Sequence, residues 1–190
     1  MNSNSNIIIE TSNDVYEPSD DSFLLADNLI AKSGDFCLDV GCGSGILSVE
    51  LAKRGCSVVA IDVNPKALEL TARNARLNGV GRAVEVRESD LFEKVPEKFD
   101  FIVFNTPYLP VSDDGVLAKA WSGGEGFKVI HRFLSEVSDH LNEDGKFEIL
   151  ISSLTKLDLG EYNDKFEFEK IASQKMFFEE IYIVAGRLKN

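Results

Sequence analysis

The sequence is poor in cysteine, histidine and basic residues. Its three cysteines, Cys37, Cys42 and Cys56, are odd in number and lack Cys-x-x-Cys spacing, which argues against disulfide bonds and a structural zinc site. The two histidines, His131 and His140, do not share a helix face and have no cysteine near them in the sequence. The residues therefore predict no metal site.

Basic residues are outnumbered, with 20 Lys and Arg against 32 Asp and Glu, and the formal net charge is −12. Because nucleic-acid affinity depends on neutralising phosphates with Lys and Arg, direct nucleic-acid binding is not expected. Two alternatives stay open. The acidity could serve only solubility, and a small basic patch could still lie within it.

Long apolar runs are also missing. No stretch is long enough to span a bilayer, and residues 1–6 are polar, without the apolar core of a signal peptide. These features lead us to expect a protein of the reducing cytoplasm with no membrane association.

The chain does contain an alternation of short apolar runs and longer helical repeats. Strands are expected at 36–40, 58–61, 83–86, 99–104 and 147–151, and helices at 19–32, 46–52, 65–77 and 127–141, with a turn at 142–145. The tail, 166–189, alternates like two antiparallel strands. Residues 7–9 predict either a short strand or a packing arm, and residues 1–14 are expected to be flexible or to form a short N-terminal arm.

These elements predict one Rossmann-like α/β domain over residues 1–190. The expected architecture is a seven-stranded, mostly parallel sheet with an antiparallel C-terminal hairpin and helices on both faces. The segment 109–126 is a long, glycine-rich loop that holds the only tryptophan, Trp121. Long loops inside domains tend to be functional, and we expect this one to gate access to a site.

The tetrapeptide Asn105-Thr106-Pro107-Tyr108 follows the buried run 99–104, at the sheet edge where open α/β folds bind ligands. Pro107 lacks an N–H and biases Thr106 towards extended geometry, which leaves backbone carbonyls unpaired. Asn105 adds a side-chain acceptor. With the ring of Tyr108 as a wall, these acceptors suit a planar group that carries an NH2, namely an amide or an amino-base. The alternative is an ordinary turn.

A second motif, Asp39-Val40-Gly41-Cys42-Gly43-Ser44-Gly45, connects an expected strand to a helix. Ile46 stands where a dinucleotide fingerprint has glycine, and no lysine follows, so neither NAD nor a phosphate-cradling loop is expected. Such a turn suits a ligand whose amino-acid part passes close to the backbone, with Asp39 receiving its ammonium.

Acidic residues end the next two expected strands. Asp62 can accept two hydrogen bonds from a ribose diol. Asp90 can accept from an adenine amino group while the Leu91 N–H donates to the ring. Together with the glycine turn, these groups predict S-adenosylmethionine as the cofactor. The alternative is that Asp39, Asp62 and Asp90 only cap turns.

With these motifs, the chain resembles class I S-adenosylmethionine-dependent methyltransferases, and more narrowly the HemK/PrmC family of release-factor glutamine methyltransferases. The resemblance covers about 15–134 and rests on Tyr16-Glu17-Pro18-Ser19-Asp20-Asp21-Ser22-Phe23-Leu24-Leu25, the glycine turn, the tetrapeptide and Trp121-Ser122-Gly123-Gly124-Glu125-Gly126. The short N-terminal lead is similar to the archaeal and eukaryotic branch, in which a small zinc-ribbon partner forms a heterodimer at the sheet edge and activates the enzyme.

The resemblance implies site residues. It places Ser22, Asp39, Gly41, Asp62 and Asp90 at the cofactor and Asn105 with the following carbonyl at the substrate amide. The full set of expected cofactor contacts is Tyr16, Pro18, Ser22, Asp39, Gly41, Gly43, Gly45, Asp62, Val63, Asp90, Leu91 and Asn105. The expected catalytic residues are Asn105, Thr106, Pro107 and Tyr108. The family usually has proline where this chain has Thr106, so the chain keeps the carbonyl and loses the rigid ring.

The expected reaction is methylation of a glutamine side-chain amide in a protein substrate, a release factor. Asn105 Oδ1 and the Thr106 carbonyl would accept the two N–H bonds of the amide and stabilise positive charge on its nitrogen. No general base is evident. Two alternatives remain, an enzyme that methylates the amino group of adenine or guanine in nucleic acid and a non-catalytic cofactor-binding subunit.

Overall fold

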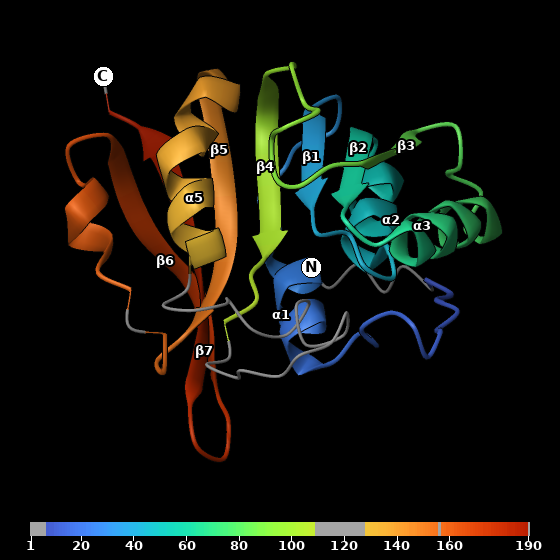
Figure 1. Ribbon diagram of the computed structural model, residues 1–190, viewed down its shortest axis with the longest axis horizontal. Coiled ribbons are helices and arrows are strands. Elements are labelled where there is room, and N and C mark those ends of the chain that lie inside the picture. The colour runs from blue at the N-terminus through green and yellow to red at the C-terminus, as the bar shows by residue number, and fades with distance from the viewer. Residues whose placement is uncertain (1–6, 109–127, 156, 190) are drawn as a thin grey trace.

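The computed structural model describes residues 7–108, 128–155 and 157–189, and it is built around one seven-stranded sheet (Figure 1). The strand order is β3-β2-β1-β4-β5-β7-β6. The strands are β1 (Phe36–Val40), β2 (Ser57–Asp62), β3 (Val84–Glu88), β4 (Phe99–Asn105), β5 (Leu141–Ser152), β6 (Phe166–Lys175) and β7 (Glu180–Leu188). β1 to β5 pair in parallel, whereas β7 pairs antiparallel with both β5 and β6. The predicted fold class is confirmed.

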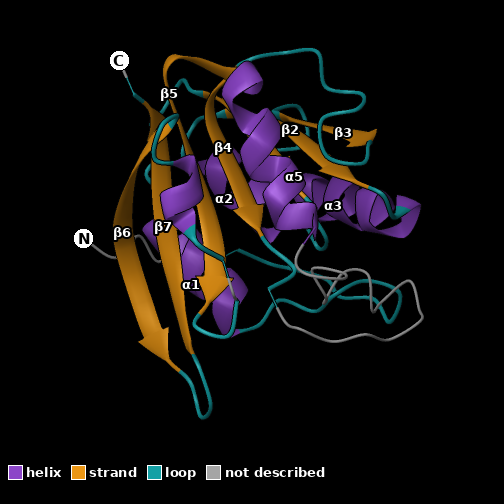
Figure 2. Ribbon diagram, turned by 60° about the vertical axis from the view of Figure 1, so that its left-hand side comes forward, coloured by secondary structure: helices purple, strands orange, loops and turns teal. Residues whose placement is uncertain are grey.

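Helices lie on both faces of the sheet (Figure 2). They are α1 (Asp20–Asn28), α2 (Ile46–Lys53), α3 (Pro65–Leu77) and α5 (Lys128–Glu136), with single 3-10 turns at η2 (Val137–His140) and η3 (Leu159–Tyr162). Residues that alternate along β4 divide between the two sides. Phe101 and Val103 pack in one core cluster with α1 and α2, and Ile102 and Phe104 pack in another with α5. Both faces of the strand are therefore buried, which explains its continuous apolar sequence.

The first helix ends earlier than the sequence predicted. α1 stops at Asn28 and not near Lys32, and Leu29 has already left the helical conformation, with ψ 126°. The Arg54 guanidinium donates to the carbonyls of Ala26 and Leu29 at 2.8 and 2.6 Å. Carbonyls at a helix end need such partners, and here a side chain from beyond the next helix supplies them.

The fifth strand begins earlier than predicted, because β5 starts at Leu141 and the expected turn at 142–145 stays beside β4. The pairing shifts register there, from Phe99 with Leu141 to Phe101 with Lys146. The Asn142 side chain donates to Asp100 Oδ1 at 2.7 Å. A Cβ on Gly145 would lie 2.8 Å from the Phe99 carbonyl oxygen, so this close approach requires glycine. The segment is a bulge within the strand.

Residues 7–10 form an arm along α3 and not a strand. The backbone N–H and carbonyl of Ile8 bond to the side chain of Asn78, and those of Glu10 bond to the side chain of Asn74. Residues 1–6 and the predicted gating loop, 109–126, lie outside the described residues. In the described part of the chain, every helix is too short or too polar to cross a membrane.

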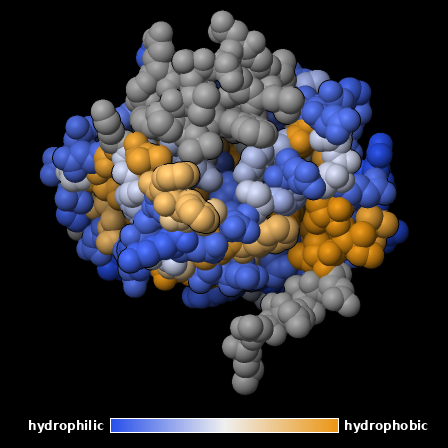
Figure 3. All heavy atoms as spheres, turned by 90° about the horizontal axis from the view of Figure 1, so that it is seen from below, coloured by the Kyte–Doolittle hydropathy of each residue, from blue (hydrophilic) through white to orange (hydrophobic). Residues whose placement is uncertain are grey.

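The arrowheads of β1, β2 and β4 point to one edge of the sheet, the lower edge in Figure 1, where α1 also lies. Polar groups at the ends of these strands are thereby brought together. Figure 3 views the molecule from this side and shows a mostly hydrophilic surface with separate apolar areas. The candidate site lies at this edge.

Candidate active site

A cavity of about 620 Å³ lies at the carboxyl ends of the parallel strands. This volume is in the range of small-molecule sites. The predicted site residues that line it are Tyr16, Ser22, Gly41, Gly43, Asp62, Val63, Asp90, Leu91, Asn105, Thr106, Pro107 and Tyr108. Pro18, Asp39 and Gly45 are not among the described lining residues. The structure thus brings together residues from five separate parts of the sequence.

The glycine turn needs glycine for its backbone. Gly41, Gly43 and Gly45 have φ angles of 65°, 54° and 79°, in the left-handed region that side chains disfavour. A Cβ on Gly45 would also lie 2.8 Å from Thr71 on α3. Gly45 therefore serves the packing of the turn against α3, whereas Gly41 and Gly43 leave backbone at the cavity wall.

Asp39 lies beneath the turn and is fully buried. Its Oδ2 accepts from the Ser48 hydroxyl at 2.5 Å, and its Oδ1 has no partner among the described residues. Burial raises the pKa of Asp39 to about 7, and the Ser48 hydrogen bonds oppose that rise. Asp39 is not among the described lining residues of the cavity, and its contact with a ligand ammonium stays a prediction. Its hydrogen bond to Ser48 ties the end of β1 to the first turn of α2.

Asp62 lies in the wall at the end of β2. Its Oδ2 accepts from the Gly43 N–H at 3.0 Å and its Oδ1 from the Asn64 N–H at 2.8 Å. Burial raises the pKa of Asp62, and these backbone donors oppose the rise. The carboxyl group is therefore fixed against the glycine turn. Each oxygen keeps a further lone pair for a ligand hydroxyl.

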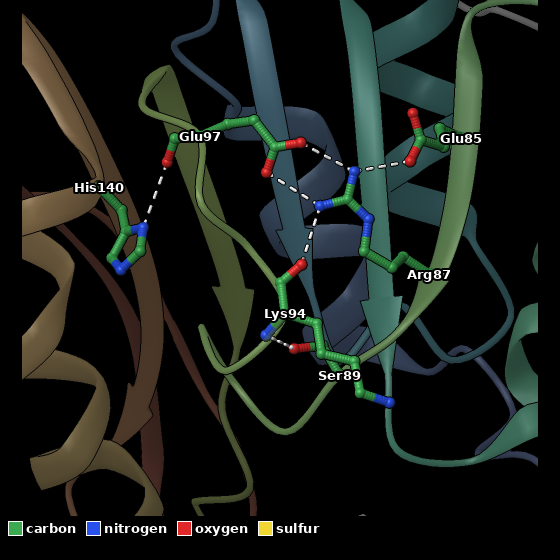
Figure 4. Close-up of polar contacts among 6 residues, drawn as sticks. All are labelled: Glu85, Arg87, Ser89, Lys94, Glu97 and His140. Atoms are coloured by element: carbon green, nitrogen blue, oxygen red, sulfur yellow. Dashed lines mark hydrogen bonds and ion pairs between the residues drawn. The ribbon is translucent and has the colours of Figure 1, made fainter.

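Asp90 and Leu91 follow β3 in a strained turn. Leu91 has a φ of 47°, which is rare outside glycine, and its carbonyl accepts from the Ser89 hydroxyl at 2.8 Å. The Asp90 carboxylate pairs with Arg132 on α5 at 3.1 Å. A second basic residue, Arg87, braces the segment that follows (Figure 4).

In that brace, the Arg87 guanidinium donates to both oxygens of Glu97 at 2.8 and 2.9 Å and to the Lys94 carbonyl at 3.0 Å. The Lys94 N–H donates to the Ser89 hydroxyl at 3.0 Å, which links the brace to the turn (Figure 4). The Arg87 hydrogen bonds lower the pKa of Glu97. This bidentate pair holds the turn that presents Asp90.

The tetrapeptide closes the other end of the cavity. The Nδ2 of Asn105 donates to Asp21 Oδ2 and to Ser22 Oγ, both at 3.2 Å. Its Oδ1 is shielded from solvent and has no partner among the described residues. Thr106 is buried, and its hydroxyl donates to the Leu150 carbonyl on β5. A side-chain hydrogen bond therefore anchors this position in place of a proline ring.

Asp21 is the main lining residue that sequence reasoning missed. Acidic residues such as Asp20 and Asp21 are common at a helix start, where the helix dipole favours negative charge, so their residue type alone does not indicate a site. In the structure Asp21 is buried and accepts from Asn105, from Ser22 and, at 3.3 Å, from the Tyr108 hydroxyl. Asp21 lies four residues before Leu25, so the two side chains share one face of α1, and both are buried. This spacing was the feature of the sequence that could have placed Asp21 on the buried face. Arg132 was also missed, because nothing local marks it.

Comparison with known proteins agrees with this geometry. The family model described as "Methyltransferase small domain" matches residues 16–178. The chain belongs to this methyltransferase family. A protein of Methanocaldococcus jannaschii, named as a candidate protein N5-glutamine methyltransferase, is 40% identical over 180 residues, which cover 90% of each chain. The human methyltransferase HEMK2 is 37% identical over 153 residues, covering 72% of this chain and 71% of its own. The predicted family resemblance is confirmed.

The methyltransferase fold also matches solved structures. The Mtq2–Trm112 complex of E. cuniculi, described as responsible for the methylation of the translation termination factor eRF1, aligns with a TM-score of 0.68. The identity is 24%, and the match covers 93% of this chain and 99% of that chain. At this identity the likeness supports the shared fold.

The lining of the methyltransferase cavity fits S-adenosylmethionine, which carries a positive sulfonium and ammonium, a ribose diol and a planar base. Its acidic residues are Asp14, Asp21, Asp62 and Asp90. Arg132 is the one basic residue among the described lining residues, and Asp90 already neutralises it. An acid-rich cavity favours a cationic ligand over a phosphate.

Proposed function

We propose that this protein methylates the side-chain amide nitrogen of a glutamine in a protein substrate, a translation release factor, with S-adenosylmethionine as methyl donor. The observation that carries the proposal is the Asn105 amide. Its Nδ2 is committed to Asp21 and Ser22, which leaves a desolvated Oδ1 without a partner among the described residues. A buried acceptor without a partner is costly, and a substrate N–H would satisfy it.

The cofactor would be held by the glycine turn and the acids at the strand ends. Asp62 would accept from the ribose hydroxyls, and Asp90 with Leu91 would meet the adenine edge. Gly41 and Gly43 give close access to the backbone. When bound, S-adenosylmethionine supplies an electrophilic methyl group. The chain supplies position and charge, and the net acidity of the walls stabilises the positive ligand.

The tetrapeptide would bind the substrate amide. An amide nitrogen is a poor nucleophile because its lone pair is delocalised into the carbonyl. Asn105 Oδ1 and the Thr106 carbonyl would accept its two N–H bonds and orient the nitrogen. These acceptors also stabilise the positive charge that develops there. Alignment supplies further acceleration, and the proton leaves to water.

The names of the relatives favour glutamine over a nucleobase. The M. jannaschii relative carries a protein N5-glutamine methyltransferase name, and the E. cuniculi complex acts on eRF1. The rival substrate, an adenine or guanine amino group in nucleic acid, would fit the same acceptors. The net charge of −12 and the absence of an unpaired basic residue among the described lining residues weigh against it.

We also propose an activating partner, a small zinc-ribbon protein that forms a heterodimer with this chain. The E. cuniculi neighbour is a complex with Trm112. Here β3 is at one edge of the sheet, with no strand beyond it in the observed order. Such an edge can pair with a strand of another chain.

The proposal is tested by incubating the protein with labelled S-adenosylmethionine and either release factor or nucleic acid, with and without a zinc-ribbon partner. We expect the release factor to gain one methyl group on a glutamine, located by mass spectrometry of its peptides. Label in nucleic acid would favour the rival enzyme. Cofactor binding without transfer under all conditions would identify a non-catalytic subunit.

A further inference from the structure

The Asn105 amide has two ends of nearly equal size, and only one of them can accept a hydrogen bond. Rotation by half a turn about its last bond would exchange them and place an NH2 where Oδ1 lies. A donor there would face the NH2 of the substrate and could not bind it. Something in the site must therefore choose the orientation of this amide.

Asp21 makes that choice by charge. An ionised carboxylate accepts hydrogen bonds and cannot donate them. Its Oδ2 lies 3.2 Å from Asn105 Nδ2, so the rotated amide would bring Oδ1 against a carboxylate oxygen. The Ser22 hydroxyl favours the same orientation of the Asn105 amide. Its hydroxyl donates to Asp21 Oδ1 at 3.2 Å, which leaves a lone pair for Asn105 Nδ2.

Asp21 is itself rigidly held. It is buried in the first turn of α1, where the helix N-terminus favours negative charge. Its Oδ1 accepts from the Ser22 N–H at 2.6 Å and from the Ser19 hydroxyl at 3.0 Å. The Tyr108 hydroxyl donates to Oδ2 at 3.3 Å. The carboxylate therefore holds both ends of the tetrapeptide, Asn105 and Tyr108.

We propose that Asp21 is a positioning residue for methyl transfer, because its carboxylate holds the Asn105 amide with Oδ1 free to accept the substrate N–H. This inference rests on the proposed function, since it needs a substrate that presents an NH2. Asp21 acts through Asn105 and need not contact the substrate itself.

The test compares Asp21→Asn and Asp21→Ala with Asp20→Asn, a control at the exposed neighbouring acid of the same helix turn. We expect kcat for release-factor methylation to fall about tenfold or more in both Asp21 variants, by a larger factor than the weakening of S-adenosylmethionine binding, at a temperature where circular dichroism shows each variant to be folded. The control should keep wild-type kcat. Equal losses of affinity, stability and kcat would overturn the inference, as would an unchanged kcat.

A swap variant separates positioning from a merely structural role. Asn105→Asp alone places two carboxylates together and should lose activity. In the double variant Asp21→Asn/Asn105→Asp, the new amide at position 21 can donate to the new carboxylate, whose second oxygen stays an acceptor. We expect at least a fivefold recovery of kcat over Asn105→Asp. A double variant no better than that single variant would overturn the inference.

A spectroscopic measurement keeps the inference testable if the wild-type protein methylates no release factor, which would count against the proposed function alone. The side-chain NH2 resonances of Asn105 in ¹⁵N-labelled protein report the hydrogen bond to Asp21. Asp21→Asn should shift them, whereas Asp20→Asn should not. Resonances unchanged by Asp21→Asn would contradict the proposed contact.

Discussion

Thr106→Val tests how this chain holds the tetrapeptide without the usual proline. The Thr106 hydroxyl donates to the Leu150 carbonyl in a position that is only 2% exposed. Valine keeps the shape and leaves that carbonyl short of a buried hydrogen bond. The expected loss is about 1–2 kcal/mol in the free energy of unfolding. For a chain of this size, that corresponds to a melting temperature lower by roughly 3–6 °C.

Urea denaturation and calorimetry measure the stability change, with Thr11→Val at an exposed position as the control. The same variant should lower kcat by up to about tenfold, because the Thr106 carbonyl is less firmly positioned. Affinity for S-adenosylmethionine should stay the same. Wild-type stability together with wild-type kcat would refute the reasoning that the hydroxyl replaces the proline ring.

Three other predictions concern stability and cofactor binding. Burial raises the pKa of Glu148 to about 8, above its value of about 4.3 in an unfolded chain. Between these two pH values the Glu148 carboxyl is protonated in the folded state and ionised in the unfolded chain, so the free energy of unfolding falls as pH rises through this range. The raised pKa of buried Asp39 lowers the free energy of unfolding with rising pH in the same way. Glu148→Gln stays neutral and should lose less stability than wild type from pH 5 to 8 in thermal melts, and identical losses would contradict this. Gly45→Ala should cost about 1–3 kcal/mol in urea denaturation, because of its positive φ and the contact with Thr71; an unchanged midpoint would argue against that strain. Asp62→Ala should weaken S-adenosylmethionine binding about tenfold or more in calorimetric titration, and a constant within twofold of wild type would remove Asp62 from the cofactor site.

Local patterns were enough to predict the sheet and the residues at its strand ends that line the cavity. The parallel strands are short, buried apolar runs, and the glycine turn shows its backbone requirement in its residue types. Asp62 and Asn105 are the last residues of their strands, and Asp90 comes two residues after β3. Their convergence at one edge therefore follows from parallel pairing alone.

The errors occurred where distant residues decide the local structure. α1 ends at Asn28 because Arg54, from beyond α2, donates to its last carbonyls. β5 begins at Leu141 because Asn142 bonds to Asp100 on the neighbouring strand. The partners Arg54 and Asp100 lie far along the sequence from the end of α1 and the start of β5, so the local sequence does not reveal either contact.

The site shows the same limit for two acids. Asp39 lies one residue before the end of β1, and Asp62 ends β2, yet only Asp62 is among the described lining residues, while Asp39 accepts from Ser48. Asp20 and Asp21 are identical in type and adjacent, and only the helix phase decides which one is buried. The residue types were visible in the sequence, but their orientation was not.

The central claim is that the Asn105 side-chain oxygen binds the NH2 of the substrate amide. The most direct measurement compares wild type with Asn105→Ala, in the presence of the zinc-ribbon partner, for S-adenosylmethionine binding by calorimetry and for glutamine methylation of release factor by mass spectrometry. The account predicts an affinity within a few-fold of wild type and no detectable methyl transfer. Methylation at a rate near wild type would contradict it.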